Sequence, residues 1–148
     1  MVLETIKGMF YLSTELNFDV TEVDGYFDVI KQWWLLRDMP YPDINFLPPT
    51  SVLIWYGDLP LCAGFLFKTD ANIAIINHVV SNPSIPGIKK WVRSEAINFL
   101  LEELIERAKV DGFQLLTASS NVHRLNKRYE DLGFEKSDEN ETHYGRIL

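Results

Sequence analysis

Residues 52–83 have the sequence VLIWYGDLPLCAGFLFKTDANIAIINHVVSNP. Two runs rich in β-branched and aromatic residues, 52–56 and 61–67, are separated by a Gly-Asp pair that favours a tight turn. This pattern predicts a β-hairpin, and the polar residues that follow it predict a turn into a third strand over 73–80. The apolar residues run almost continuously through these strands instead of alternating. The segment therefore predicts a sheet covered by helices on both faces.

The clearest helix of the chain follows the hairpin, over residues 89–110. Its apolar residues recur on one side and its glutamates on the other, the pattern of a helix that packs on a core. Gly112 is its natural C-terminal stop. The periodicity then predicts three further parts: a central strand over 113–118, a helix over 121–132 closed by Gly133, and strands at Phe134 and about 143–148.

The N-terminal side adds one strand and one helix. Residues 9–13 form a short aromatic run that predicts a strand, and residues 21–24 resemble a helix cap before a helix over 24–38. Residues 40–49 hold four prolines, so we expect an ordered loop with one helical turn. The predicted order is β-α-βββ-α-β-α-ββ. This is an α/β (α+β) fold with a mixed, mostly antiparallel sheet of 6–7 strands.

Composition favours one acidic domain over residues 1–148. The chain has 14 Lys and Arg against 21 Asp and Glu, and its net charge of −7 argues against broad nucleic-acid binding. Cys62 is the one cysteine; we expect it to be buried and inert in mid-strand, in a reducing cytoplasm. No apolar run approaches the ~18 residues of a membrane span, and the first residues lack a signal-peptide pattern. We therefore expect no membrane association.

The segment Arg128-Tyr-Glu-Asp-Leu-Gly-Phe134 ends the predicted last helix. Its Tyr-x-x-x-Gly-Phe element, together with the order of the predicted elements, resembles the GCN5-related N-acetyltransferase (GNAT) superfamily. Residues 47–49, 64–69 and 79–83 resemble small GNAT-like proteins of bacteriophage genomes, which would place the chain in the host cytoplasm. The resemblance implies an acetyl-CoA-dependent N-acetyltransferase that acts by direct attack in a ternary complex. The alternative is a GNAT-like binding or structural protein without catalysis.

The resemblance implies a diphosphate site at the start of the long helix. In the family, glycines of this loop let backbone N–H groups close around the acetyl-CoA pyrophosphate. The matching segment here is 86–91, and Lys89 and Trp91 stand where the family has glycine. Lys89 and Lys90 are then expected to bind the pyrophosphate or the ribose 3′-phosphate, with Ile88 and Trp91 beside them. The alternative is a solvated helix start with ordinary lysines.

The resemblance also implies a site for the pantetheine arm. In the family this arm pairs with the backbone of the fourth strand, here Val79, Val80 and Ser81. Alternatively, the two valines are simply core. Asn121 is expected to cap the last helix, and in the family an asparagine near this position touches the cofactor.

Acetyl transfer needs a base for the amine and an acid for the leaving thiolate. By resemblance Tyr129 is the acid; otherwise it is a helix-packing tyrosine. His78 suits a base, although a lone histidine is more often structural. Strand alternation predicts Asn77 and His78 on opposite faces, so that one of them faces the substrate. His123 and the other histidines lack the spacing of a metal site.

The family builds the acceptor side from the first helix, the loop after it and the last strands. The aromatic residues there are Trp33, Trp34, Tyr41, Phe46 and Tyr144, and the acidic ones Asp38, Asp43 and Glu141. An aromatic, acidic cleft would suit a cationic amine, whether a small molecule or a protein. Adjacent tryptophans cannot share a helix face, so one of the pair is expected at a pocket or partner surface. The hairpin edge or the last strands offer a homodimer contact.

Overall fold

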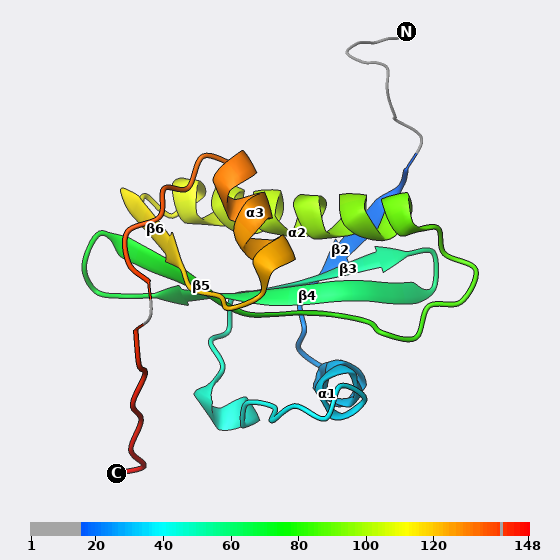
Figure 1. Cartoon of the computed structure of the whole chain (residues 1–148), viewed down its shortest axis with the longest axis horizontal. Coiled ribbons are helices and arrows are strands. Elements are labelled where there is room, and N and C mark those ends of the chain that lie inside the picture. The colour runs from blue at the N-terminus through cyan, green and yellow to red at the C-terminus, as the bar shows by residue number, and fades with distance from the viewer. Residues whose placement is uncertain (1–15, 140) are drawn as a thin grey trace, which may run out of the picture. The chain divides into compact units, whose positions relative to one another are not determined.

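The computed structural model describes residues 16–139 and 141–148 (Figure 1). These residues form two compact units that divide after Ala118. The single domain predicted over 1–148 stays a prediction. The strand predicted over 9–13 lies outside the described residues. Within the described part, no helix is long and apolar enough to cross a bilayer.

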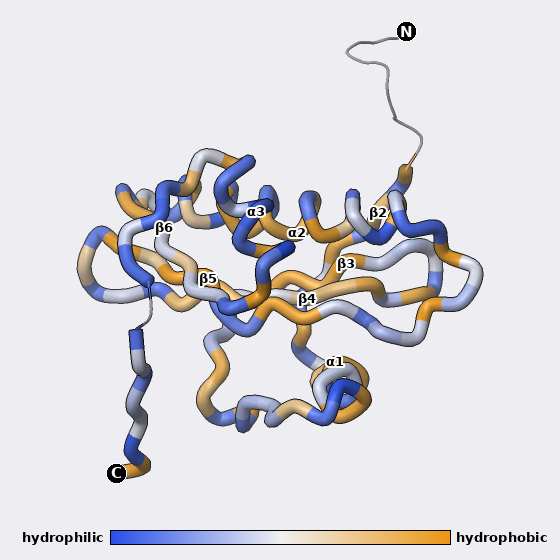
Figure 2. The backbone as a smooth tube through the Cα atoms, viewed as in Figure 1, coloured by the Kyte–Doolittle hydropathy of each residue, from blue (hydrophilic) through white to orange (hydrophobic). Residues whose placement is uncertain are grey.

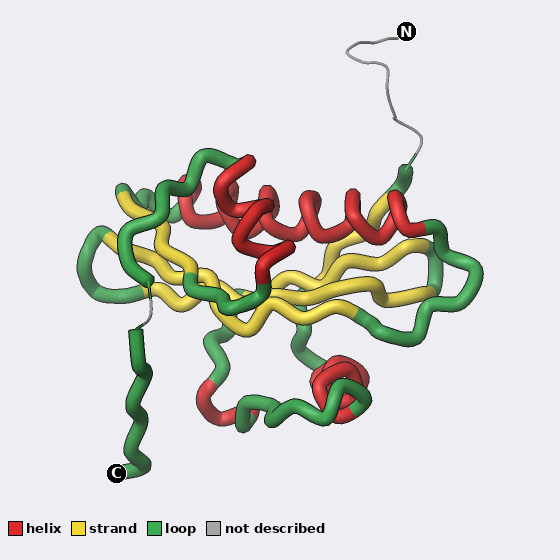
Figure 3. The backbone as a smooth tube through the Cα atoms, in the orientation of Figure 1, coloured by secondary structure: helices red, strands yellow, loops and turns green. Residues whose placement is uncertain are grey.

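The first unit holds a five-stranded sheet in the order β2-β3-β4-β5-β6 (Figure 3). Its first three pairings are antiparallel, and β5 and β6 are parallel. The mixed, mostly antiparallel sheet is therefore confirmed, with one strand fewer than the lowest predicted number. The strands are β2 (Phe18–Thr21), β3 (Ser51–Tyr56), β4 (Leu59–Lys68), β5 (Ile73–Ser81) and β6 (Leu115–Ala118).

Helices cover both faces of this sheet, as the continuous apolar runs predict. Helix α1 (Phe27–Leu35) lies on one face and α2 (Lys90–Val110) on the other (Figure 1). The single turn predicted between the prolines is the 3-10 helix η1 (Ile44–Phe46). Gly112, in the left-handed region at φ 86°, ends α2 as expected.

Strand β4 shows how the two faces are divided. Phe65 packs with Ile30 and Trp33 of α1, whereas the thiol of Cys62 lies 3.5 Å from the Ala96 carbonyl oxygen of α2. Cys62 is fully buried in mid-strand, which confirms the predicted burial. Figure 2 shows the hydrophobic residues running along the central strands. A strand enclosed on both sides needs no polar face.

Three boundaries differ from the sequence prediction. Strand β2 was missed because residues 21–24 resemble a helix cap, although Phe18 and Val20 alternate with polar residues as in a strand. Helix α1 is shorter than the predicted 24–38 because it begins only after Gly25, at φ 86°. Strand β6 is the last strand of the described sheet, not a central one, and Leu115 is exposed on it.

The second unit contains helix α3 (His123–Asp131) and an irregular segment after it. The predicted strands at Phe134 and 143–148 are wrong for this structure, since these residues have no strand conformation. Residues 135–139 are polar and exposed, and residues 141–148 are also exposed. A segment without buried side chains has little to gain from joining a sheet.

Candidate functional site

Strand β5 changes its surroundings halfway along. Its first half pairs with β6, and the last partners in register are Ile76 and Ala118. From Asn77 to Ser81 the strand pairs with β4 alone among the described strands. The two strands therefore separate after Ile76, and this leaves one backbone edge of β5 open.

A β-bulge lies where the open edge begins. On β4, Ala63 faces Val80 and Phe65 faces Asn77, so the single residue Gly64 opposes two residues of β5. One of these two is His78, whose φ of 56° is unusual for a residue other than glycine. A Cβ built on Gly64 would lie 3.0 Å from the Cδ1 atom of Leu104. Glycine thus lets α2 approach the sheet at the bulge.

The bulge overturns the predicted alternation of Asn77 and His78. Asn77 faces Phe65 in register, and the His78 ring lies 6.4 Å from the Phe65 ring and 5.9 Å from that of Phe67. Both residues therefore lie toward the α1 face. The Asn77 side-chain oxygen accepts a 2.8 Å hydrogen bond from the His78 backbone N–H, which holds the turn of the bulge.

The chemistry of His78 fits a base. Burial lowers the pKa of its imidazole, so the ring is neutral at neutral pH and has a lone pair free to take a proton. Its place beside two aromatic rings supplies the burial.

The direction of the open backbone groups follows from one hydrogen bond. The Asn82 N–H donates to the Leu61 carbonyl of β4 at 2.8 Å. Within one peptide unit C=O and N–H point in opposite directions, so the Ser81 C=O points away from β4. Strand alternation adds the Ser81 N–H and the Val79 C=O to the same edge. These groups form a short lane on which an extended amide chain can pair.

The side chains along the lane are mostly core. Val80 is 6% exposed and packs with α1, and a Val79 methyl lies 3.3 Å from a Cβ built on Gly64. The two interpretations of these valines are compatible, because side chains fill the core while the backbone edge stays open.

Arg37, just beyond α1, lies at the Ser81 end of this lane. Its NH1 group donates to the carbonyl oxygens of Trp33 (3.2 Å) and Ser81, and its NH2 group donates to the Ser81 hydroxyl at 2.9 Å. The role of this residue was not predicted, because no spacing in the sequence links position 37 to position 81.

The start of α2 is open to an anion. Lys89 is the N-cap residue, and no side chain caps the helix within the described residues. A hollow of about 250 Å³ lies beside it, lined by Tyr56, Gly87, Ile88, Lys89, Trp91 and Val92. Tyr56 is an addition to the predicted set. Trp91 lines this hollow and is 57% exposed, so its side chain is not buried there.

In the second unit, the Tyr-x-x-x-Gly-Phe element closes helix α3. Gly133 has φ 94°, which turns the chain so that the Phe134 N–H donates to the Tyr129 carbonyl at 3.0 Å. The Tyr129 and Phe134 rings meet edge to face at 5.2 Å. Burial raises the pKa of the Tyr129 phenol, which therefore stays protonated at neutral pH.

Two expectations are wrong: the cap formed by Asn121 and the surface position of one tryptophan. Asn121 does not cap α3: the N-cap residue is Val122, whose N–H donates to the Ser120 hydroxyl. Trp33 and Trp34 are only 3% and 5% exposed, so the expectation that one of them lies at a surface is wrong. Rings of this size reach the same sheet from helix directions about 100° apart.

The remaining acceptor-side residues are spread over the surface. Tyr41 lies under the Lys31 ammonium at 4.7 Å, and Asp43 caps η1 by accepting the Asn45 N–H at 2.8 Å. Tyr144, in the second unit, is 92% exposed.

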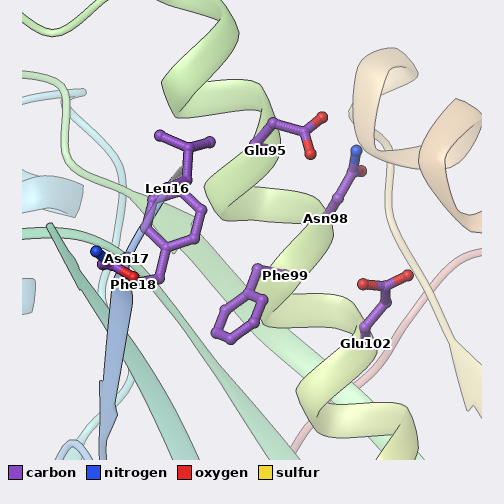
Figure 4. A pocket seen from close by; sticks show the side chains of 7 residues that line it. All are labelled: Leu16, Asn17, Phe18, Glu95, Asn98, Phe99 and Glu102. Carbon is purple, nitrogen blue, oxygen red and sulfur yellow. The ribbon is translucent and has the colours of Figure 1, made fainter. Parts of the chain in front are cut away.

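A second hollow, of about 300 Å³, lies between β2 and α2 (Figure 4). Phe99 of α2 meets Phe18 of β2 at 5.5 Å, and Glu95, Asn98 and Glu102 line the helix side. Strand β2 is at the opposite edge of the described sheet from β6. This hollow is therefore separate from the open edge of β5. Among the described residues, no three His, Cys, Asp or Glu side chains are grouped to hold a metal ion.

The sequence matches no protein-family model and no curated protein. Solved structures do match. A probable acetyltransferase of unknown function from Staphylococcus aureus shares 13% identity at a TM-score of 0.63, over 88% of this chain and 100% of that one. The chain has the GNAT fold.

Two further solved structures extend the comparison. A GNAT-family acetyltransferase from Streptococcus pneumoniae has a TM-score of 0.57 and 14% identity, over 88% of this chain and 98% of that one. The N-acetylglutamate synthase of Neisseria gonorrhoeae, in complex with coenzyme A and N-acetyl-glutamate, has a TM-score of 0.59 and 12% identity. It matches over 85% of this chain and 30% of that one.

Proposed function

We propose that the protein is an acetyl-CoA-dependent N-acetyltransferase that acts on a primary amine. The observation that carries this proposal is the second half of β5, where a bulge and an open backbone edge adjoin a neutral histidine. Coenzyme A bound to the Neisseria synthase of the same fold supports the choice of cofactor.

The pantetheine arm pairs with the open edge in this proposal. Its amides would meet the Val79 C=O and the Ser81 N–H, with Val80 fixing the strand from the core. The diphosphate would lie at the uncapped start of α2, where Lys89 and Lys90 add positive charge. Ile88 and Trp91 line the adjoining hollow, and Asn121 stays a proposed cofactor contact from the second unit.

Transfer proceeds by direct attack in a ternary complex. The amine nitrogen forms a bond to the thioester carbon, and the bond from that carbon to sulfur breaks. The nitrogen loses one proton to His78, directly or through water, and the leaving thiolate takes one from the Tyr129 phenol. A protonated tyrosine and a neutral histidine are the states that these roles need.

The acceptor is a small-molecule or protein amine. Asn77, Tyr41 and Tyr144 are the proposed contacts that reach the surface, whereas Trp33 would act from the core by shaping the α1 face. A homodimer and a bacteriophage origin remain predictions. The non-catalytic alternative rests on side chains in place of the family glycines, but Trp91, one of them, is 57% exposed and not buried in the loop.

Calorimetric titration with acetyl-CoA and CoA, followed by an assay over a panel of amines, tests the proposal. Wild type and Tyr129→Phe should both bind, and the variant should lose roughly 10²-fold in kcat. Tyr26→Phe, in a partly exposed tyrosine of the first unit, is the matched control and should keep full turnover. Absence of binding at millimolar ligand would contradict the proposal.

A further inference from the structure

Arg37 holds the end of β5 from the side on which the cofactor arm would lie. The Ser81 C=O that accepts from its NH1 group points away from β4, because the N–H of the next peptide unit, at Asn82, points toward β4. The guanidinium therefore lies at the open edge, at the end of the lane formed by Val79 and Ser81.

The charge of this guanidinium has no counter-ion among residues 16–139 and 141–148. Its three hydrogen bonds go to neutral oxygens of Trp33 and Ser81, and Arg37 takes part in no ion pair with the described residues. Partial burial lowers the pKa of Arg37, which reflects desolvation without a compensating carboxylate. The residue is nonetheless exposed enough for a ligand to reach it.

The guanidinium also has N–H groups that are not used in these contacts. Of its five N–H groups, three are used in the contacts with Trp33 and Ser81. The Nε–H and one N–H of NH2 have no acceptor within the described part of the chain. Two donors of this kind suit the oxygens of a phosphate group.

We propose that Arg37 binds the phosphate at the end of the pantetheine arm. This inference rests on the proposed function. An arm that pairs with the Val79 C=O and the Ser81 N–H cannot continue past Ser81 along the strand, because the guanidinium occupies the next acceptor. The arm leaves the strand there, and its phosphate comes beside the cation.

Three ligands separate this contact from a structural one: pantetheine without phosphate, 4′-phosphopantetheine, and CoA. Each is titrated by NMR into folded wild type, Arg37→Gln and Arg37→Lys, with Arg107→Gln in the last turn of α2 as the charge-matched control. Arg37→Gln should weaken CoA and 4′-phosphopantetheine by roughly tenfold or more and leave pantetheine unchanged. The affinity of Arg37→Lys for the two phosphate-containing ligands should lie between those of wild type and Arg37→Gln. The control should bind all three ligands as wild type does.

The outcomes are distinct. If wild type binds none of the ligands, the proposed function and this inference both fail. If wild type binds CoA and Arg37→Gln binds it equally well, this inference alone fails. Equal weakening of all three ligands would show a purely structural role and also overturn it. Should Arg37→Gln not fold, Arg37→Lys decides, since the inference requires normal pantetheine binding and several-fold weaker CoA binding.

Discussion

The two halves of β5 differ in sequence and in surroundings: residues 73–76 are all apolar, whereas residues 77–81 include Asn77, His78 and Ser81. Residues 73–76 run between β4 and β6 in regular register, and Ala74 and Ile76 are fully buried. Residues 77–81 carry the bulge, pair with β4 alone among the described strands, and end at Arg37. The comparison shows that one strand can supply the core with its side chains and a candidate binding lane with its backbone.

Removing side-chain volume from the paired half should have the largest effect. Ile76→Ala leaves a cavity at a fully buried position and should lower the free energy of unfolding by about 2–5 kcal/mol. Urea denaturation measures this loss. Ile75→Ala, on the partly buried face of the same half, should cost clearly less. Equal losses would contradict the assignment of faces.

Adding volume opposite the bulge should have the next largest effect. The new Cβ of Gly64→Ala would lie 3.0 Å from Leu104 Cδ1 and 3.3 Å from Val79 Cγ2, so the variant should lose roughly 1–3 kcal/mol of stability. Gly145→Ala is the control, because nothing lies within 4 Å of its Cβ. A neutral Gly64→Ala would mean that α2 does not approach the sheet closely at the bulge.

The sequence predicts the paired half far better than the open one. Continuous apolar runs and the Gly-Asp turn give β3, β4, β5 and both covering helices. The bulge breaks the two-residue period on which strand prediction depends, so the placement of Asn77 and His78 was wrong. Gly64 in mid-strand was the signal for it. The Arg37 contact joins positions 44 residues apart, and no local pattern encodes it.

The C-terminal segment is a second region where the sequence prediction was wrong. Its predicted strands, at Phe134 and about 143–148, came from the local sequence pattern alone. In the structure these residues are mostly exposed, and no described strand pairs with them. The Tyr-x-x-x-Gly-Phe element is explained locally, because Gly133 in the left-handed region stacks Phe134 on Tyr129.

A smaller effect is expected where α1 ends beside Arg37. Asp38 has φ 55°, a conformation that glycine adopts without cost, so Asp38→Gly should stabilise the protein by about 1 kcal/mol or less. Thermal denaturation checks this. Asp70→Gly, at an exposed position without positive φ, should give no gain. A loss of stability in Asp38→Gly would show that the aspartate side chain is needed there.

The smallest expected effect is a pH dependence at the bulge. Burial lowers the pKa of His78 in the folded state, so the unfolded chain, with its histidine pKa near 6.5, takes up this proton first as pH falls. Stability from this group is therefore present above about pH 6.5 and lost below it. His78→Asn, a residue that tolerates positive φ, should lose less stability on acidification than wild type. Parallel urea titrations at neutral and acidic pH measure the free energy of unfolding of both proteins. An equal loss of this free energy on acidification in both would contradict the burial of this ring.

The open edge of β5 is the central feature of the proposed site, and hydrogen exchange at single amides tests it most directly. On addition of CoA, the Ser81 N–H, which points away from β4, should exchange more slowly, while the Ile76 N–H in the paired half should be unchanged. Unaltered exchange at Ser81 under saturating CoA, or an absence of CoA binding, would contradict the claim that the lane binds the pantetheine arm.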